Sequence, residues 1–196
     1  INIDGNFNML NNAHFSAVDR AASEVVVNVN NGGVMNVKGI TIVDRDGRDN
    51  CGATLNLKSG SQLNIGQSGI SKYSIKGEDL SQTTREQLIL NIEEGATLGI
   101  LDGVQKWSTE RALTWTGDVT VNTQGYKVAE NGIGGTREGG SAGTIELGSV
   151  RGIDGATTGA GVIKEGIGTL VVGAGSTLTE LAVNAGSAGF DGAATV

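Results

Sequence analysis

Three aspartates and two arginines surround one glycine in the stretch IVDRDGRDN, residues 42 to 50. Asp44 and Asp46 are two positions apart, so both side chains point to one side of an extended segment, and Asp49 can fold back across Gly47. Calcium prefers such a group of carboxylate oxygens. However, the familiar calcium loop has glycine at its sixth position and a closing glutamate at its twelfth. Here the sixth position is Asp49, so the three aspartates match this motif only in part.

The same acids suggest sugar cleavage as an alternative. Glycoside hydrolases use two carboxylates, and a polysaccharide lyase would need acidic metal ligands beside a basic residue, which Arg45 or Arg48 could supply. Nothing else in the sequence supports such a site. Because adjacent arginines relieve the repulsion between acids in water, we interpret the stretch as an exposed turn with no cofactor.

Other catalytic arrangements are also missing from the sequence. His14 is the only histidine, and no serine lies in a Gly-x-Ser-x-Gly setting, so a hydrolase triad is not expected. Cys51 is the only cysteine, which excludes an internal disulfide and a cysteine-rich metal site. We therefore expect a protein that is not an enzyme, with the polysaccharide-active enzyme as the alternative.

Composition narrows the fold and the partners. The 196 residues include 33 glycines and no proline, which favours many tight corners between uninterrupted strands. The chain has 14 basic and 21 acidic residues, a net charge of −7, so nucleic acid is not expected as a partner. We find neither a signal peptide nor an apolar run of membrane-spanning length, and we interpret the chain as a fragment of a mature protein.

A phrase of the form apolar-Asn-apolar predicts the strands. In an extended strand its two apolar side chains point to one face and the asparagine to the other. Five copies of the phrase are centred on Asn28, Asn36, Asn56, Asn64 and Asn91. The strands are short and separated by close-set glycine or polar corners, which leaves a hairpin sandwich or a solenoid. Because the strands are too short for a sandwich, we predict an all-β, right-handed parallel β-helix with coils of about 20 residues.

Three segments depart from this pattern within what we take as a single β-helix segment, residues 1–196. Residues 13–24 suggest a small helical or irregular cap at the N-terminal end. Residues 77–87 and 131–143 suggest protruding loops, the second of which holds six glycines.

The outward asparagines are the candidate binding residues. If the coils stack in register, their amides would lie about 4.8 Å apart and form ladders along one face. Such a wall suits contact with surface glycans or proteins, or with a copy of itself, although asparagine ladders can also be purely structural. Among the rings that could stack on sugars, Trp115 is expected in the core, Tyr126 is a candidate, and Trp107 is the better exposed candidate.

Residues 161–186, GVIKEGIGTLVVGAGSTLTELAVNAG, carry a more specific signal. The elements are Gly161 to Lys164, then Gly166, Gly168, Thr169 and Leu170, then Val183 to Gly186. This resembles the passenger-associated repeat of bacterial autotransporters, the type V secreted proteins, and in particular the AIDA-like adhesins. The membrane-embedded barrel of that family has no counterpart in this sequence.

The resemblance implies a passenger segment at the surface of a Gram-negative cell, anchored to the outer membrane or secreted. Its expected function is adhesion to host-cell or bacterial surface molecules, or cell aggregation. A passive stalk that carries an absent domain is a further alternative.

Overall fold

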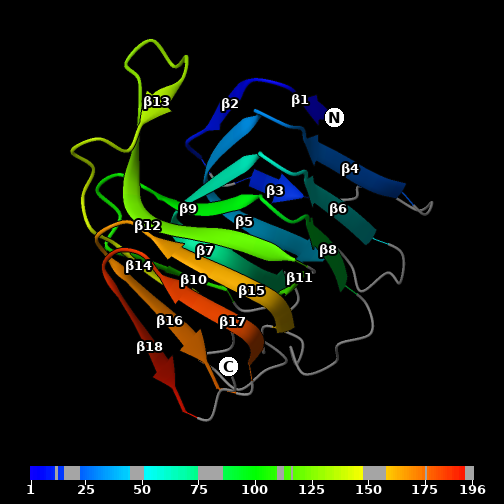
Figure 1. Ribbon diagram of the computed structural model, residues 1–196. Coiled ribbons are helices and arrows are strands. Elements are labelled where there is room, and N and C mark those ends of the chain that lie inside the picture. The colour runs from blue at the N-terminus through cyan, green and yellow to red at the C-terminus, as the bar shows by residue number, and fades with distance from the viewer. Residues whose placement is uncertain are drawn as a thin grey trace.

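The computed structural model describes residues 1–11, 13–15, 23–44, 51–74, 86–109, 113–115, 117–147, 158–174 and 176–192. These residues are all-β, without a helix, and their strands pair in parallel except for β12 with β13 (Figure 1). The prediction of an all-β, mostly parallel structure is therefore confirmed.

The strands form three rows, in each of which neighbours along the row are hydrogen-bonded. The first row contains β1 (Asn2–Ile3), β4 (Ser23–Val29), β6 (Cys51–Leu57), β8 (Glu86–Ile92), β11 (Thr114–Trp115) and the beginnings of β15 (Thr158–Glu165) and β17 (Thr177–Val183). The second row contains β2 (Asn6–Met9), the first parts of β5 (Val34–Asp44) and β7 (Gln62–Ser74), β9 (Thr97–Leu101), the first part of β12 (Asp118–Val128), and the ends of β15 and β17.

The third row begins with β3 (Ala13–Phe15) beside the ends of β5 and β7. It continues with β10 (Lys106–Ser108), β14 (Thr144–Leu147), β16 (Thr169–Gly173) and β18 (Ser187–Asp191). A bridge between Ile70 and Thr109 connects the two parts. The chain passes from the first row to the second, then to the third, and then returns to the first, an order consistent with a β-helix.

The repeat differs from the predicted length of about 20 residues. Asn8, Asn36 and Asn64 are register partners 28 residues apart. The spacing also varies along a row, because Val121 and Lys164 are register partners 43 positions apart, whereas Lys164 and Val183 are only 19 apart. Because insertions at corners leave the strand register unchanged, the repeat length cannot be deduced from strand spacing alone.

Alternation places the apolar residues in the core as predicted. Val29, Val37, Leu57 and Ile65, each of which follows an asparagine by one position, are all 0% exposed. Register partners such as Val29, Leu57 and Ile92 stack on one another along the rows. Burial of each such side chain contributes about 1.5–3 kcal/mol, so these stacks hold the asparagines on the opposite side of each strand.

Glycines form the corner between the first and second rows. Gly32, Gly60, Gly95 and Gly117 have φ of 76°, 75°, 79° and 78°, a region that favours glycine. Gly32 N donates to Gly60 O at 3.3 Å, and Gly60 N donates to Gly95 O at 3.1 Å. The abundance of glycine in the sequence is thus explained in part by one corner repeated in successive strands.

The motif at residues 161–186 is built around a buried lysine. Lys164 is 0% exposed, and its Nζ donates to the carbonyls of Glu165, Gly166 and Ala185 at 2.9, 2.6 and 2.7 Å. Gly186 has φ 71°, and a Cβ there would overlap the Gly168 and Gly166 carbonyls. The lysine and glycines of the motif therefore fix one corner, which gives them a structural role.

The three expected departures have different outcomes. A helical cap at 13–24 is wrong where the chain is described, because Ala13–Phe15 form β3 and Ser23 and Glu24 begin β4. In the segment 77–87, Glu86 and Gln87 belong to β8, and the rest lies outside the described residues. Residues 131–143 do belong to a projecting hairpin, which includes β13 (Gly135–Thr136) (Figure 1).

Candidate functional site

Asparagines of the first row form a hydrogen-bonded column, here called the uncovered ladder: Asn2, Asn28, Asn56 and Asn91. Each Nδ2 donates to the Oδ1 of the preceding member, at 2.8, 2.7 and 2.7 Å in turn. The register continues from Asn91 to Thr114, Thr158 and Thr177. Asn28 and Asn56 each use one N–H on the preceding asparagine and one oxygen lone pair on the following one. A second N–H and a second lone pair of each side chain therefore remain for an external partner.

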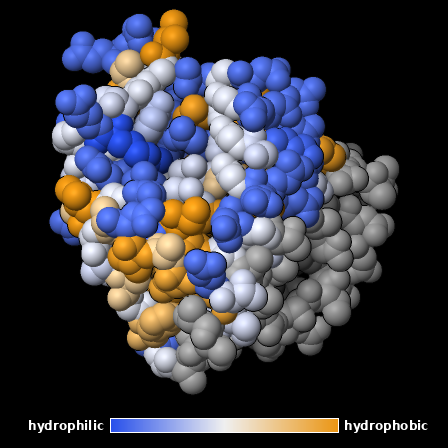
Figure 2. All heavy atoms as spheres, in the orientation of Figure 1, coloured by the Kyte–Doolittle hydropathy of each residue, from blue (hydrophilic) through white to orange (hydrophobic). Residues whose placement is uncertain are grey.

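The uncovered ladder is accessible to solvent. Asn28 and Asn56 are half-buried and Asn91 is exposed. On the face shown in Figure 2, hydrophilic residues gather over β4, β6 and β8. The prediction that asparagines form an in-register ladder on an open face is confirmed for Asn28, Asn56 and Asn91.

A second polar column, the flanking row, lies two positions further along the chain, directly after the ends of the same strands: Asp4, Asn30, Lys58 and Glu93. Asn30 Nδ2 donates to Asp4 Oδ1 at 2.6 Å, and Lys58 Nζ lies 2.6 Å from Glu93 Oε1. The hydrogen bond from Lys58, with a second from the Ser59 amide, lowers the pKa of the Glu93 carboxyl. The two columns together form a polar strip with both charged and amide groups.

The asparagines of the second row form another column, here called the covered ladder: Asn8, Asn36 and Asn64. Asn36 Nδ2 donates to Asn8 Oδ1 at 2.7 Å, and Asn64 Nδ2 donates to Asn36 Oδ1 at 2.8 Å. Asn36 and Asn64 are 0% exposed, so the expectation of solvent-facing amides is wrong for these two. Their side chains do point away from the core, but another segment covers them.

That segment is the hairpin of residues 123–143, which leaves the second row at the end of β12. Asn8 Nδ2 donates to Gly132 O at 2.5 Å, and Arg137 Nη2 donates to Asn64 Oδ1. The Arg137 guanidinium also lies 5.4 Å from the centre of the Tyr126 ring. Burial lowers the pKa of Arg137 to about 10, so the group is still protonated near pH 7.

The aromatic candidates for sugar stacking are enclosed. Trp107 is 1% exposed and its Nε1 donates to Gly99 O at 3.1 Å, so the prediction of an exposed ring is wrong. Its polar sequence neighbours were misleading because Trp107 is the inward residue of a three-residue strand. Tyr126 is only 7% exposed, whereas Trp115, at 4%, is in the core as expected.

The acidic stretch is described only at its start. Asp44 ends β5, while Asp46 and Asp49 lie outside the described residues. Within the described ranges, no group of three or more histidine, cysteine, aspartate or glutamate side chains is placed to hold a metal ion. The part of the chain that the structure describes also has no helix long and apolar enough to cross a membrane.

Comparison of the chain with models of known families, with curated proteins and with solved structures found no match.

Sequence reasoning missed several members of these columns. Asn2 and Asn8 carry the same apolar-Asn-apolar phrase, in Ile1-Asn2-Ile3 and Phe7-Asn8-Met9, so the signal for them was present in the sequence. Arg137 had no recognisable signal, because it reaches Asn64 across 73 positions. Only the register of the folded chain shows that a hairpin residue completes an asparagine column.

Proposed function

We propose that this chain is a right-handed parallel β-helix from the passenger of a bacterial autotransporter. In this proposal it acts without catalysis at the cell surface, where the uncovered ladder and the flanking row bind molecules of another cell or another copy of the chain. The single observation that supports it best is the in-register, solvent-accessible column of Asn2, Asn28, Asn56 and Asn91.

The cyclic order of the three rows supports the β-helix. Parallel crossovers between strands of one sheet are almost always right-handed, which favours that hand here. The resemblance of residues 161–186 to the passenger-associated repeat supports the family. The convergence of Lys164, Gly166, Ala185 and Gly186 on one corner gives a physical reason for that motif.

The chemistry of the strip supports binding by many weak contacts. Each amide offers a donor and an acceptor to a hydroxyl or a peptide group, and a single neutral hydrogen bond contributes only about 0.5–1.5 kcal/mol. Repetition along the ladder multiplies such contacts on an extended ligand, and display of many copies on a cell adds avidity. The absence of an exposed ring among Trp107, Trp115 and Tyr126 favours amide contact over ring stacking.

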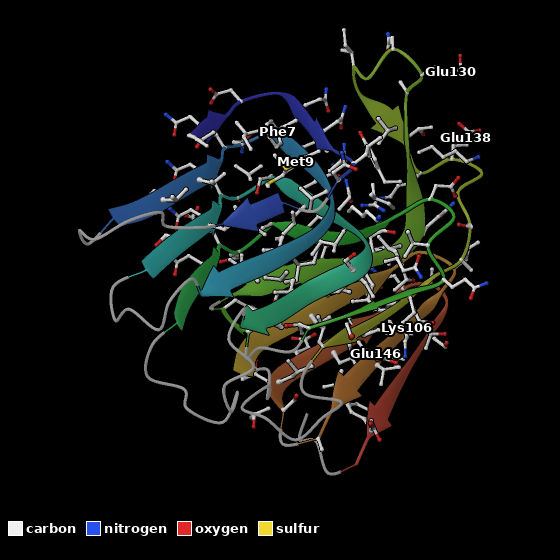
Figure 3. The ribbon with its side chains drawn as sticks, turned by 180° about the vertical axis from the view of Figure 1, so that it is seen from behind. Phe7, Met9, Lys106, Glu130, Glu138 and Glu146 are labelled. Atoms are coloured by element: carbon white, nitrogen blue, oxygen red, sulfur yellow. The ribbon has the colours of Figure 1, made fainter. Side chains whose placement is uncertain are left out.

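The test displays the chain on a bacterium that does not otherwise aggregate. The ladder variant is N28T/N56T/N91T, because the register already places threonine at the later positions of this column and threonine suits strands. The matched control is K106A/E146A, which removes a polar pair from the third row, where Lys106 Nζ lies 3.0 Å from Glu146 Oε1 (Figure 3). We expect the ladder variant to lose aggregation or attachment and the control to keep it.

The alternatives have distinct outcomes. Equal attachment by the ladder variant and the unaltered chain would reject the ladder as the binding face. Attachment by neither would favour a passive stalk. Release of new sugar ends from polysaccharides, lost in D44N/D46N/D49N, would instead favour the enzyme.

A further inference from the structure

The hairpin of residues 123–143 is firmly attached at its base. Gly125 N donates to Ser141 O at 2.8 Å, and Gly143 N donates to Thr123 O at 2.9 Å. Ser141 N and Oγ donate to Asp102 Oδ1 at 2.8 and 2.9 Å. This base connects the hairpin to the turn after β9 and leaves the rest of it as a separate arm.

Fewer contacts hold the distal part, residues 127–139. It is paired within itself through Lys127 with Thr136 and Val128 with Gly135. Gly132 and Arg137 make its hydrogen bonds to the asparagines beneath. Ile133, the large apolar residue at the tip, is 73% exposed and does not anchor the arm.

Figure 3 shows Glu130 and Glu138 on this projecting arm, away from Phe7 and Met9 of β2. Segments with few buried apolar contacts open at low free energy.

The absence of a side chain at Gly99 leaves space for the Arg137 guanidinium beside Asn64. Gly99 is the register partner of Asn64 and of Asn122, so an asparagine there would extend the column. A Cβ at Gly99 would overlap Arg137 Nη2 and Asn64 Oδ1. The guanidinium therefore occupies the position that the next side chain of the column would take.

The closed and the open state of the arm each leave the polar groups of Arg137 and of the covered ladder with partners. When the arm is closed, Arg137 has amide, carbonyl and ring partners but its charge is buried, which is why its pKa is lowered. When the arm is open, the guanidinium is hydrated again. In the open state Asn36 keeps its hydrogen bonds to Asn8 and Asn64 and becomes accessible to solvent, as Asn56 already is. The loss of contacts on opening is thus partly offset.

We propose that the distal hairpin is a removable cover, that Arg137 is its latch, and that opening it presents the covered ladder as a second binding column beside the first. The part of this proposal that concerns binding rests on the proposed adhesive function. The part that concerns opening does not, and it can be measured separately.

Thiol labelling tests the cover. Cys51, the only cysteine of the chain, is changed to serine, and a single cysteine is placed in the covered ladder (N36C) or in the uncovered ladder (N56C). The latch is then removed by R137Q, or by G99A, in which the added methyl meets both Arg137 Nη2 and Asn64 Oδ1 and so displaces their hydrogen bond. A disulfide-exchange reagent reports the reaction rate of each thiol in the folded chain.

With the latch intact, N36C should react at least about tenfold more slowly than N56C, and G99A or R137Q should accelerate N36C by about tenfold or more. That change is the one expected when a hydrogen bond to a charged group is lost. N56C should react at the same rate in all backgrounds. Equal rates for N36C and N56C would overturn the cover, and an N36C rate unaffected by both latch variants would overturn the latch.

A second measurement does not depend on the folding of N36C. Hydrogen exchange of the Ala129 amide, which donates to Gly134 O at 3.1 Å, should accelerate in G99A in a chain without added cysteine, and unchanged exchange would contradict the latch. On displayed cells, G99A should increase attachment. Attachment by neither chain would reject the adhesive function, whereas the labelling result would still decide the cover.

Discussion

Replacement of Lys164 by methionine is predicted to destabilise the C-terminal strands strongly. The change keeps the length and apolar stem of the side chain but removes an ammonium that donates at 2.9, 2.6 and 2.7 Å to three carbonyls. The bond to Gly166 O is buried, and an unpaired buried acceptor costs about 1–3 kcal/mol. The Glu165 and Ala185 carbonyls are partly accessible and recover water, so their losses are smaller.

A gain partly offsets these losses. Burial lowers the pKa of Lys164, which means that the fold opposes its charge, and methionine removes that penalty. The net cost is expected to be about 2–4 kcal/mol, in line with the removal of one partner from a buried charged network. The matched control is Lys106→Met, which breaks only the surface pair with Glu146 and should cost about 0–1 kcal/mol.

Native-state hydrogen exchange is the suitable assay, because stacked repeats can unfold locally and a global transition would average over them. The amides to follow are Asn184 N, bonded to Lys164 O, and Ser187 N, bonded to Gly168 O. A cost of about 2–4 kcal/mol corresponds to roughly 30-fold to 1,000-fold faster exchange. Exchange within about threefold of the unaltered chain would refute the account of the motif as a lysine-centred corner.

Three further outcomes follow from the contacts. Asn36→Ala should lower the free energy of unfolding by about 2–4 kcal/mol, because it leaves the buried Asn64 Nδ2 and the half-buried Asn8 Oδ1 without their partner, whereas Asn56→Ala should cost about 1 kcal/mol; urea denaturation compares them. Hydrogen bonds from Ser141 lower the pKa of Asp102, so the carboxylate stabilises the hairpin base above its ordinary pKa and the effect is lost as the pH falls through the lowered value. The measurement is the protection of the Gly125 and Gly143 amides relative to their intrinsic exchange rates, and protection that does not fall in acid would contradict this. Trp107→Ala should cost about 3–5 kcal/mol, and a smaller change than 1 kcal/mol would refute its core position.

The strands and the core could be predicted from the sequence because alternation acts locally. In an extended strand, the apolar residues on each side of an asparagine point to the same face, so their burial turns the asparagine outward. Val29 and Leu57 were therefore correctly placed inside, and Asn28 and Asn56 outside. The same rule predicts ladders once the strands are parallel and in register.

Coverage and repeat length could not be predicted in this way. Asn36 and Asn56 are both central residues of the apolar-Asn-apolar phrase, yet Asn36 is 0% exposed and Asn56 is half-buried, because only the second row lies beneath the hairpin. Trp107 has polar neighbours but faces inward, because only the central residue of the three-residue strand β10 points into the core. These differences depend on contacts between residues far apart in the chain, such as Arg137 with Asn64.

The most direct test of the binding face is a lysine footprint of the attached chain. Lys58 belongs to the flanking row beside the uncovered ladder, and Lys106 lies on the third row. Acetylation of both lysines is compared between the free chain and the chain attached to cells. We expect attachment to slow the modification of Lys58 and to leave that of Lys106 unchanged, whereas protection of Lys106 alone would place the contact on another face and contradict the proposed binding face.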